Sequence, residues 1–251
     1  MSALTLKLFA CVCMLLDHLG YCIPEFFPLR IVGRLAFPLY VFLLTEGFRH
    51  TSSRLRYTLR LFVFALLSQV PFGLFLAKDP FCTKLNVMVT LLLSLIGIWV
   101  TELGHRKPVT RLLSWLFVLC LCMVFWMNLL DADYGAKGIL LAQAFYAFGN
   151  QKGKRGAALL TLGLLVSFFH VVLLEQGFDF LRMLVALPKL YRWPDEWTWM
   201  QLFTLLTVPL ILSYNGEKGP APSTRFLRKL TQYAFYAFYP IHMLILYVTI
   251  R

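Results

Sequence analysis

Long apolar stretches dominate the chain, and short polar segments separate them. Most of the stretches approach the roughly 20 residues that a helix needs to cross a bilayer, and they are continuous rather than alternating in the period of two typical of strands. The pattern therefore predicts an all-α polytopic membrane protein with about nine transmembrane helices in a single domain, residues 1–251. The expected helices cover residues 4–22, 30–48, 57–77, 85–103, 110–129, 137–149, 157–174, 199–213 and 231–250. The sixth and eighth are short, as tilted, broken or partly re-entrant helices are.

Composition strengthens this prediction. Hydrophobic residues make up 59% of the chain and charged residues 14%, whereas a soluble domain has about 45–50% and about 25%. The net charge of +12 does not indicate nucleic-acid binding, because Lys and Arg gather in alternate loops, as the positive-inside rule predicts. The N-terminus is accordingly expected in the cytoplasm and the C-terminus outside. The basic loops are 49–60, 105–111, 152–155 and 217–229, and residues 175–198 form an expected outer interfacial loop.

Three side chains inside the apolar stretches are candidates for chemistry. Asp17 and His18 lie near the end of the first stretch, and His242 lies in the last. Ionisable groups at this depth are costly and mark functional sites by default. Helical rise places His18 and His242 roughly 8 Å and 12 Å below the outer ends of their helices, so both are expected to open on one cavity. The alternatives are structural: a hydrogen bond between helices, or for His242 a bond to a carbonyl freed by Pro240.

The charged neighbours suggest two ion pairs. Consecutive helical residues point about 100° apart, so Asp17 is expected to pair with Arg34 at the same edge of the next helix rather than with His18. Glu46, near the other end of that helix, is expected near Arg60. Both pairs are compatible with a purely structural role.

Other polar groups admit two interpretations each. The basic segment with Arg54, Arg56 and Arg60 follows from membrane topology and anionic lipid, or it binds a phosphate-rich ligand through arginine forks. Gln69 and Asn86 are typical of hydrogen bonds between helices.

Acids, cysteines and missing motifs narrow the chemistry further. Asp131 and Asp133 cap the short sixth helix, or they hold a cation or an acceptor sugar. The cysteines show no metal-ligand spacing, and a disulfide between Cys22 and Cys82 stays open. The chain contains no phosphate-binding loop, dinucleotide fingerprint or zinc helix.

Together, several short motifs resemble the TraX family of integral membrane proteins, and through it the membrane acyltransferase-3 group. The motifs that carry the resemblance are Leu16-Asp17-His18-Leu19-Gly20, Gly33-Arg34-Leu35-Ala36-Phe37-Pro38-Leu39, Glu46-Gly47-Phe48, Ser68-Gln69-Val70-Pro71-Phe72, Asp133-Tyr134-Gly135 and Tyr236-Ala237-Phe238-Tyr239-Pro240-Ile241-His242. In the broader group ten residues separate a basic residue from the reactive histidine that follows it, and Lys7 takes that place relative to His18. The family's arginine pair on a cytoplasmic loop corresponds imperfectly to Arg54 and Arg56.

The resemblance implies transfer of an acyl group, usually acetyl, from acyl-coenzyme A to a hydroxyl or amine of an acceptor outside. His18 would act as the general base, with Asp17 and His242 beside it. The implied donor-binding residues are Lys7, Arg54, Arg56 and Arg60, and the supporting polar residues are Arg34, Glu46, Gln69, Asn86 and Tyr239. His242 or Asn86 would orient the acceptor or stabilise the oxyanion, and no metal is implied. The alternative is a non-enzymatic transporter or assembly component of an envelope complex.

Overall fold

The computed structural model describes residues 1–105, 107–148, 156, 160–164, 200–220 and 222–250. Within these residues the secondary structure consists of helices without a named strand, which confirms the all-α prediction. The helices are α1 Ala3–Cys22, α2 Leu29–Gly33, α3 Ala36–His50, α4 Arg54–Ala77, α5 Val87–Gly104, α6 Pro108–Trp126, α7 Gly135–Phe148, α11 Thr207–Leu212 and α12 Arg225–Ile250, with 3₁₀ turns at η1 Pro24–Phe26 and η3 Gln201–Leu206.

Six stretches of the described chain are long and apolar enough to cross a membrane. They are Ala3–Cys22, Leu29–His50, Arg54–Ala77, Val87–Gly104, Pro108–Trp126 and Arg225–Ile250. The polytopic membrane class therefore holds, while the count of nine and the orientation of the termini stay predictions. Most of the expected seventh helix and the whole loop 175–198 lie outside the described residues.

Two expected helices are interrupted where proline removes a backbone donor. The predicted helix 30–48 divides into α2 and α3 at Arg34 and Leu35, because Pro38 has no N–H to donate to the Arg34 carbonyl. In the described part of the predicted helix 199–213, the 3₁₀ turn η3 precedes the short helix α11, which contains Pro209. Conversely, α12 begins at Arg225, six residues before the expected start.

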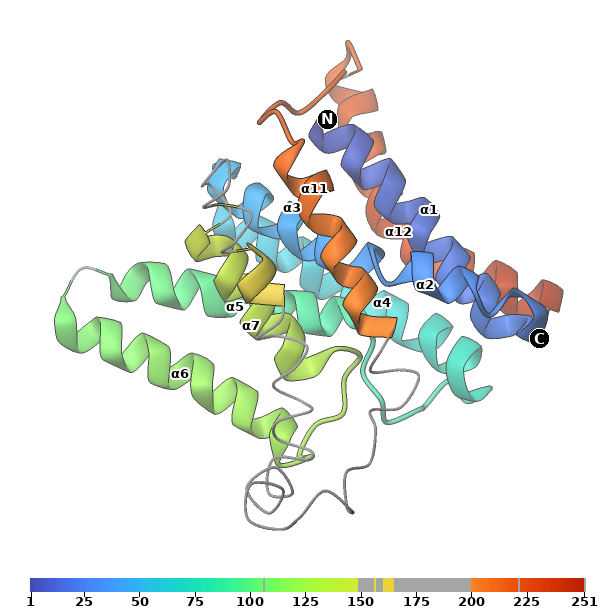
Figure 1. Cartoon of the computed structure of the whole chain (residues 1–251), viewed down its shortest axis with the longest axis horizontal. Helices are drawn as coiled ribbons and strands as arrows, with labels where there is room; N and C mark the ends of the chain where they lie inside the picture. Colours follow the sequence, from blue (N-terminus) through green and yellow to red (C-terminus); the bar gives the residue numbers. More distant parts are fainter. Residues whose placement is uncertain (106, 149–155, 157–159, 165–199, 221, 251) are drawn as a thin grey trace, which may run out of the picture.

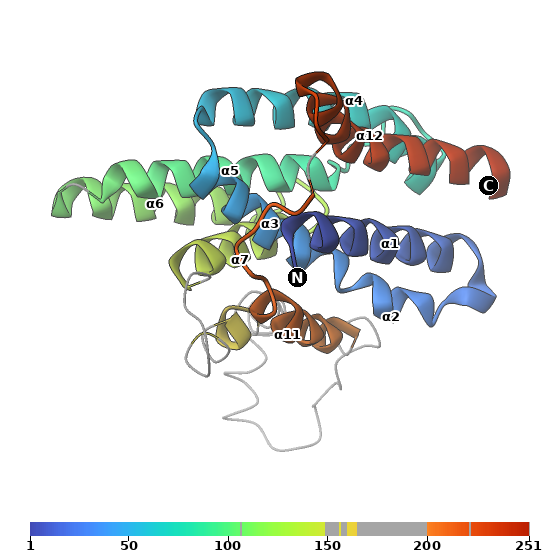
Figure 2. The ribbon, with the colours of Figure 1, turned by 90° about the horizontal axis from the view of Figure 1, so that it is seen from above.

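The helices that position the site surround one apolar core. α1 packs on α3 and α12, α4 packs on α12 and α5, and α7 packs on α3 and α5 (Figures 1 and 2). α7 approaches closely because Gly138 has no side chain: a Cβ there would lie 2.4 Å from Thr90 Cγ2 and 2.8 Å from Phe37 Cζ. α6 lies at the periphery against α5 and α7, and it exposes an apolar face that includes Leu112 and Leu116, as a lipid-facing helix does.

The segment between α11 and α12 closes over the start of α1. The backbone N–H groups of Ala3 and Leu4 donate to the carbonyls of Glu217 (2.8 Å) and Lys218 (3.2 Å). These two N–H groups belong to the first helical turn, whose donors have no acceptor within their own helix. The contact fixes Lys218 beside the N-terminal end of α1.

Candidate functional site

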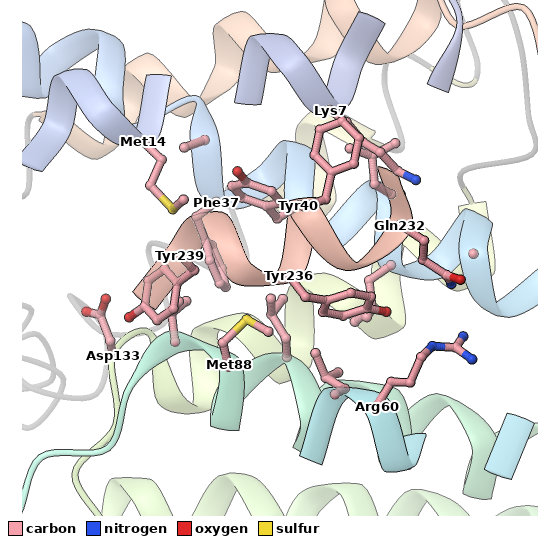
Figure 3. A pocket seen from close by; sticks show the side chains of 18 of the residues that line it. Lys7, Met14, Phe37, Tyr40, Arg60, Met88, Asp133, Gln232, Tyr236 and Tyr239 are labelled. Carbon is pink, nitrogen blue, oxygen red and sulfur yellow. The ribbon is translucent and has the colours of Figure 1, made fainter. Parts of the chain in front are cut away.

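A cavity of about 950 Å³ lies between α1, α3, α4, α5 and α12 (Figure 3). Its volume is at the upper end of the range usual for ligand sites. Figure 3 shows Asp133 at one end of the cavity, Lys7, Arg60 and Gln232 at the other, and Tyr40 and Tyr236 between them. The charged side chains of the cavity therefore lie at its two ends, with aromatic side chains between them.

The histidine end is the part lined by Asp17, His18, Arg34 and Asp133. Here the guanidinium of Arg34 donates to Asp17 Oδ1, which confirms the predicted ion pair. Arg30 joins it, with Nε 3.8 Å from the same oxygen. All three side chains are at least five-sixths buried, so the pair exists in a low-dielectric site where one carboxylate offsets two guanidinium groups.

His18 and His242 are directly hydrogen-bonded. His18 Nδ1 lies 2.6 Å from His242 Nε2, and His242 Nδ1 lies 2.6 Å from the carbonyl oxygen of Phe238. His18 lines the cavity, whereas His242 is 5% exposed and lies behind it. The alternative that His242 bonds to a backbone carbonyl is therefore confirmed in part. The carbonyl is that of Phe238 and not the one freed by Pro240.

These contacts assign the tautomers of the neutral pair. A carbonyl only accepts, so His242 Nδ1 must carry the proton and His242 Nε2 must be the acceptor. His18 Nδ1 is then the donor, which leaves the lone pair of His18 on Nε2. Within the described residues Nε2 of His18 makes no hydrogen bond. The arrangement can therefore accept a proton from a molecule in the cavity, with His242 holding the ring in place.

Close packing holds the ion pair against α2. A Cβ at Gly33 would lie 2.3 Å from Asp17 Cβ and 2.4 Å from Asp17 Oδ1, closer than atoms approach in real proteins. We expect Gly33→Ala to displace Asp17 and to lower the thermal midpoint of the detergent-solubilised protein by several degrees. An unchanged midpoint for Gly33→Ala would contradict this packing.

Asp133 and Tyr239 complete the histidine end. Both line the cavity, and the Tyr239 ring lies 6.0 Å from the His242 ring between centroids. Asp133 follows α6 in the chain and precedes α7, and burial raises the pKa of its carboxyl group, against the effect of Lys84. Tyr134 beside it stacks on Phe37 at 3.7 Å between ring centroids, which fixes this turn against α3.

The basic mouth is the opposite end, lined by Lys7, Arg60, Lys218 and Arg228. Lys7 and Arg60 were expected there. The sequence places Lys218 and Arg228 only in the basic loop 217–229. It does not show that α12 begins as early as Arg225 or that the segment 213–218 contacts α1. The sequence signal for Arg228 is its position three residues after Arg225, which places both basic residues on one face of the first turn of α12.

Arg54 and Arg56 do not line the cavity, and Glu46 does not pair with Arg60, which corrects three expectations. Arg54 binds Glu102 at 2.5 Å, and Arg56 is exposed. Glu46 instead accepts from Arg49, one helical turn away on α3. Glu46 thus pairs with an arginine of its own helix, and Arg54 pairs with an acid on α5. Sequence spacing alone does not show which face of α5 Glu102 occupies.

Gln69 and Asn86 form the interhelical bonds that one interpretation predicted. Asn86 caps α5 by accepting from the Met88 N–H, and its amide donates to the carbonyl of Ala65 and to Gln69 Oε1. Asn86 is fully buried and does not line the cavity, so it is not positioned to orient an acceptor.

The described residues contribute neither a disulfide nor a metal-ligand cluster to the site. The Cys82 thiol is free and donates to the Lys84 carbonyl, so the disulfide with Cys22 is not formed. Among the described residues no three His, Cys, Asp or Glu side chains gather as metal ligands do.

The fold and the cavity define a polytopic helical membrane protein with charged groups at both ends of an internal cavity. Residues 2–250 match the TraX protein family, and the chain therefore belongs to that family. It is also 28% identical, over 259 residues, to a Dichelobacter nodosus protein described as "Probable fimbrial assembly protein FimC, serogroup H1", covering 98% of this chain and 94% of that relative. No solved structure matches the chain.

Proposed function

We propose that the protein is an acyltransferase of the bacterial inner membrane that moves an acetyl or other acyl group from cytosolic acyl-coenzyme A to a hydroxyl or amine of an acceptor outside. The observation that carries the proposal is one cavity that joins the basic mouth to the hydrogen-bonded pair of His18 and His242. A donor entering from one side and an acceptor entering from the other would meet at His18.

The basic mouth suits the phosphates of coenzyme A. Lys7, Arg60, Lys218 and Arg228 supply positive charge around the opening, and arginine forks match phosphate oxygens. Lys7 and His18 are eleven positions apart on α1, which is about three helical turns and roughly 16 Å. The extended arm of the donor would cover that distance along the wall formed by Tyr40, Tyr236 and their apolar neighbours.

The chemistry proposed at the histidine end is a direct transfer. The acceptor's O–H or N–H gives its proton to His18 Nε2 while its oxygen or nitrogen attacks the thioester carbonyl carbon. The carbon–sulfur bond then breaks, the thiolate takes the proton from His18, and coenzyme A leaves as the thiol. Arg30 and Arg34 add positive potential for the developing oxyanion. His242 has both nitrogens engaged, so its proposed role is to position His18.

A first test addresses the donor site. We expect Lys7→Gln and Arg60→Gln each to weaken acetyl-coenzyme A binding about tenfold or more, since a hydrogen bond to a charged group contributes about 1.5–3 kcal/mol. The measurement is titration of protein in lipid nanodiscs with acetyl-coenzyme A. Arg56→Gln is the matched control, because Arg56 is exposed and does not line the cavity. Equal losses in all three variants would show that diffuse charge, and not this mouth, binds the donor.

A second candidate function is assembly of a surface structure without chemistry. The relative described as a fimbrial assembly protein favours it. On that alternative the polar cavity would be a structural feature, and loss of the His18 base would not affect assembly.

A further inference from the structure

Asp133 carries a carboxylate that the proposed chemistry does not use. Its backbone is fixed by a bond from its N–H to the Leu85 carbonyl (3.0 Å) and a bond from the Thr90 hydroxyl to its own carbonyl. Its carboxylate lines the cavity, where Lys84 and Arg34 attract it electrostatically, and it forms no hydrogen bond or close ion pair with a residue that the structure describes. A carboxylate held in this way is available to a ligand.

Tyr239 presents a complementary group beside it. The side chain is 4% exposed, and its hydroxyl lies near the backbone of Val87 without a hydrogen bond of normal geometry to any residue that the structure describes. Figure 3 shows the Tyr239 hydroxyl and the Asp133 carboxylate directed toward the same part of the cavity. A buried hydroxyl without a partner costs free energy, and a ligand at this place would remove that cost.

The two groups together match a hydroxyl. A hydroxyl both donates and accepts, so it can donate to Asp133 and accept from the Tyr239 O–H. An ammonium only donates, so it could donate to Asp133 and to the tyrosine oxygen but would leave the Tyr239 O–H without an acceptor.

The surrounding charge argues in the same direction. Arg30, Arg34 and Lys84 line this end of the cavity, against the two acids Asp17 and Asp133. Asp17 is already shared by two arginines, so an ammonium would face three cations with one carboxylate left for it. A neutral or anionic ligand meets no such repulsion.

We propose that Asp133 and Tyr239 form an acceptor subsite that binds a hydroxyl of a neutral or anionic polyol and discriminates against an ammonium group. The role of the bound molecule as an acyl acceptor rests on the proposed function, whereas its binding can be measured independently. The subsite lies beside the histidine pair, because the Tyr239 and His242 rings are neighbours, and it therefore would present the ligand to His18.

The test compares two matched probes in nanodiscs, methyl glucoside and its 2-amino analogue, by ligand-observed NMR titration. We expect the neutral glucoside to bind more tightly. Tyr239→Phe and Asp133→Leu should each weaken its binding about tenfold, because each removes one hydrogen bond at a buried site. Asp133→Asn should change it less than threefold, since the amide oxygen still accepts. Asp131→Asn, an exposed neighbouring acid, is the control and should change nothing.

Two results would overturn the subsite. One is tighter binding of the amino sugar that Asp133→Asn abolishes, which would identify an ammonium site. The other is no measurable glucoside binding, or binding that Tyr239→Phe leaves unchanged; this variant removes one oxygen and is not expected to disturb folding.

Acetyl-coenzyme A titrations of the same samples separate the two proposals. Glucoside binding that responds to both residues, without donor binding, would retain the subsite and refute the acyltransferase. Donor binding and thiol release, together with glucoside binding that does not change in the Asp133 and Tyr239 variants, would retain the acyltransferase and refute the subsite.

Discussion

Replacement of His18 by alanine is expected to slow acetyl transfer by a factor of about 10²–10⁴, the usual contribution of a general base. The reason is the tautomer chain from Phe238 through His242, which leaves the lone pair of His18 Nε2 without a partner in the described structure. Release of free thiol from acetyl-coenzyme A by the reconstituted protein measures the rate. Binding of acetyl-coenzyme A should stay within about twofold of wild type, because the basic mouth lies at the other end of the cavity.

Companion variants make this result specific. His242→Ala should lower kcat less than His18→Ala and leave KM for the donor unchanged, as expected for a residue that only positions the base. His105→Ala is the control, because His105 is exposed and away from the cavity. If His18→Ala turned over acetyl-coenzyme A at the wild-type rate, the acyltransferase mechanism would be wrong. Normal surface-structure assembly in that same variant would then favour the assembly component.

The membrane class and the family were predictable because both rest on local features. Long apolar stretches predict helices wherever they occur, and the motifs around His18 and Tyr239 carry the family resemblance without any knowledge of packing. The ion pair of Asp17 and Arg34 was also predictable. Both residues lie near the same end of consecutive helices, and few opposite charges compete at that depth.

The partners of the other charges were not predictable from spacing. Arg54 binds Glu102, which is 48 positions away on α5, so the contact depends on how α4 and α5 are rotated about their axes. Helix rotation is decided by packing at positions such as Gly138, where a missing side chain lets α7 approach α5. Sequence periodicity shows which face of a helix is apolar, but in a membrane the lipid-facing side is apolar as well.

The bond between the two histidines shows the same limit at the site itself. Sequence placed His18 and His242 at similar depth, which predicts a shared cavity. It does not predict that one histidine lines the cavity and the other lies behind it, and this difference separates the base from the residue that positions it. Likewise, the capping role of Asn86 follows from where α5 begins, at Val87.

Removal of the Asp17 charge is expected to give the largest loss of stability among single substitutions at the site. Asp17→Asn keeps the shape of the side chain but leaves Arg30 and Arg34 buried with no carboxylate between them. Breaking a buried pair in this way costs about 3–5 kcal/mol. For a chain of this size that corresponds to a fall of about 6–20 °C in Tm, which fluorescence-detected size-exclusion chromatography after heating would measure.

Two further variants show whether the loss of stability comes from removing the Asp17 carboxylate from between Arg30 and Arg34. Asp131→Asn removes an exposed carboxylate and should leave Tm within about 1 °C of wild type. Arg34→Met combined with Asp17→Asn should lose less than Asp17→Asn alone, because one of the two guanidinium groups that lost the Asp17 carboxylate is gone. A double variant that is less stable by the sum of both single losses would mean that Asp17 and Arg34 act independently. The histidine end would then be held by packing, with Gly33 and the α1–α2 contact as its main support, rather than by the ion pair.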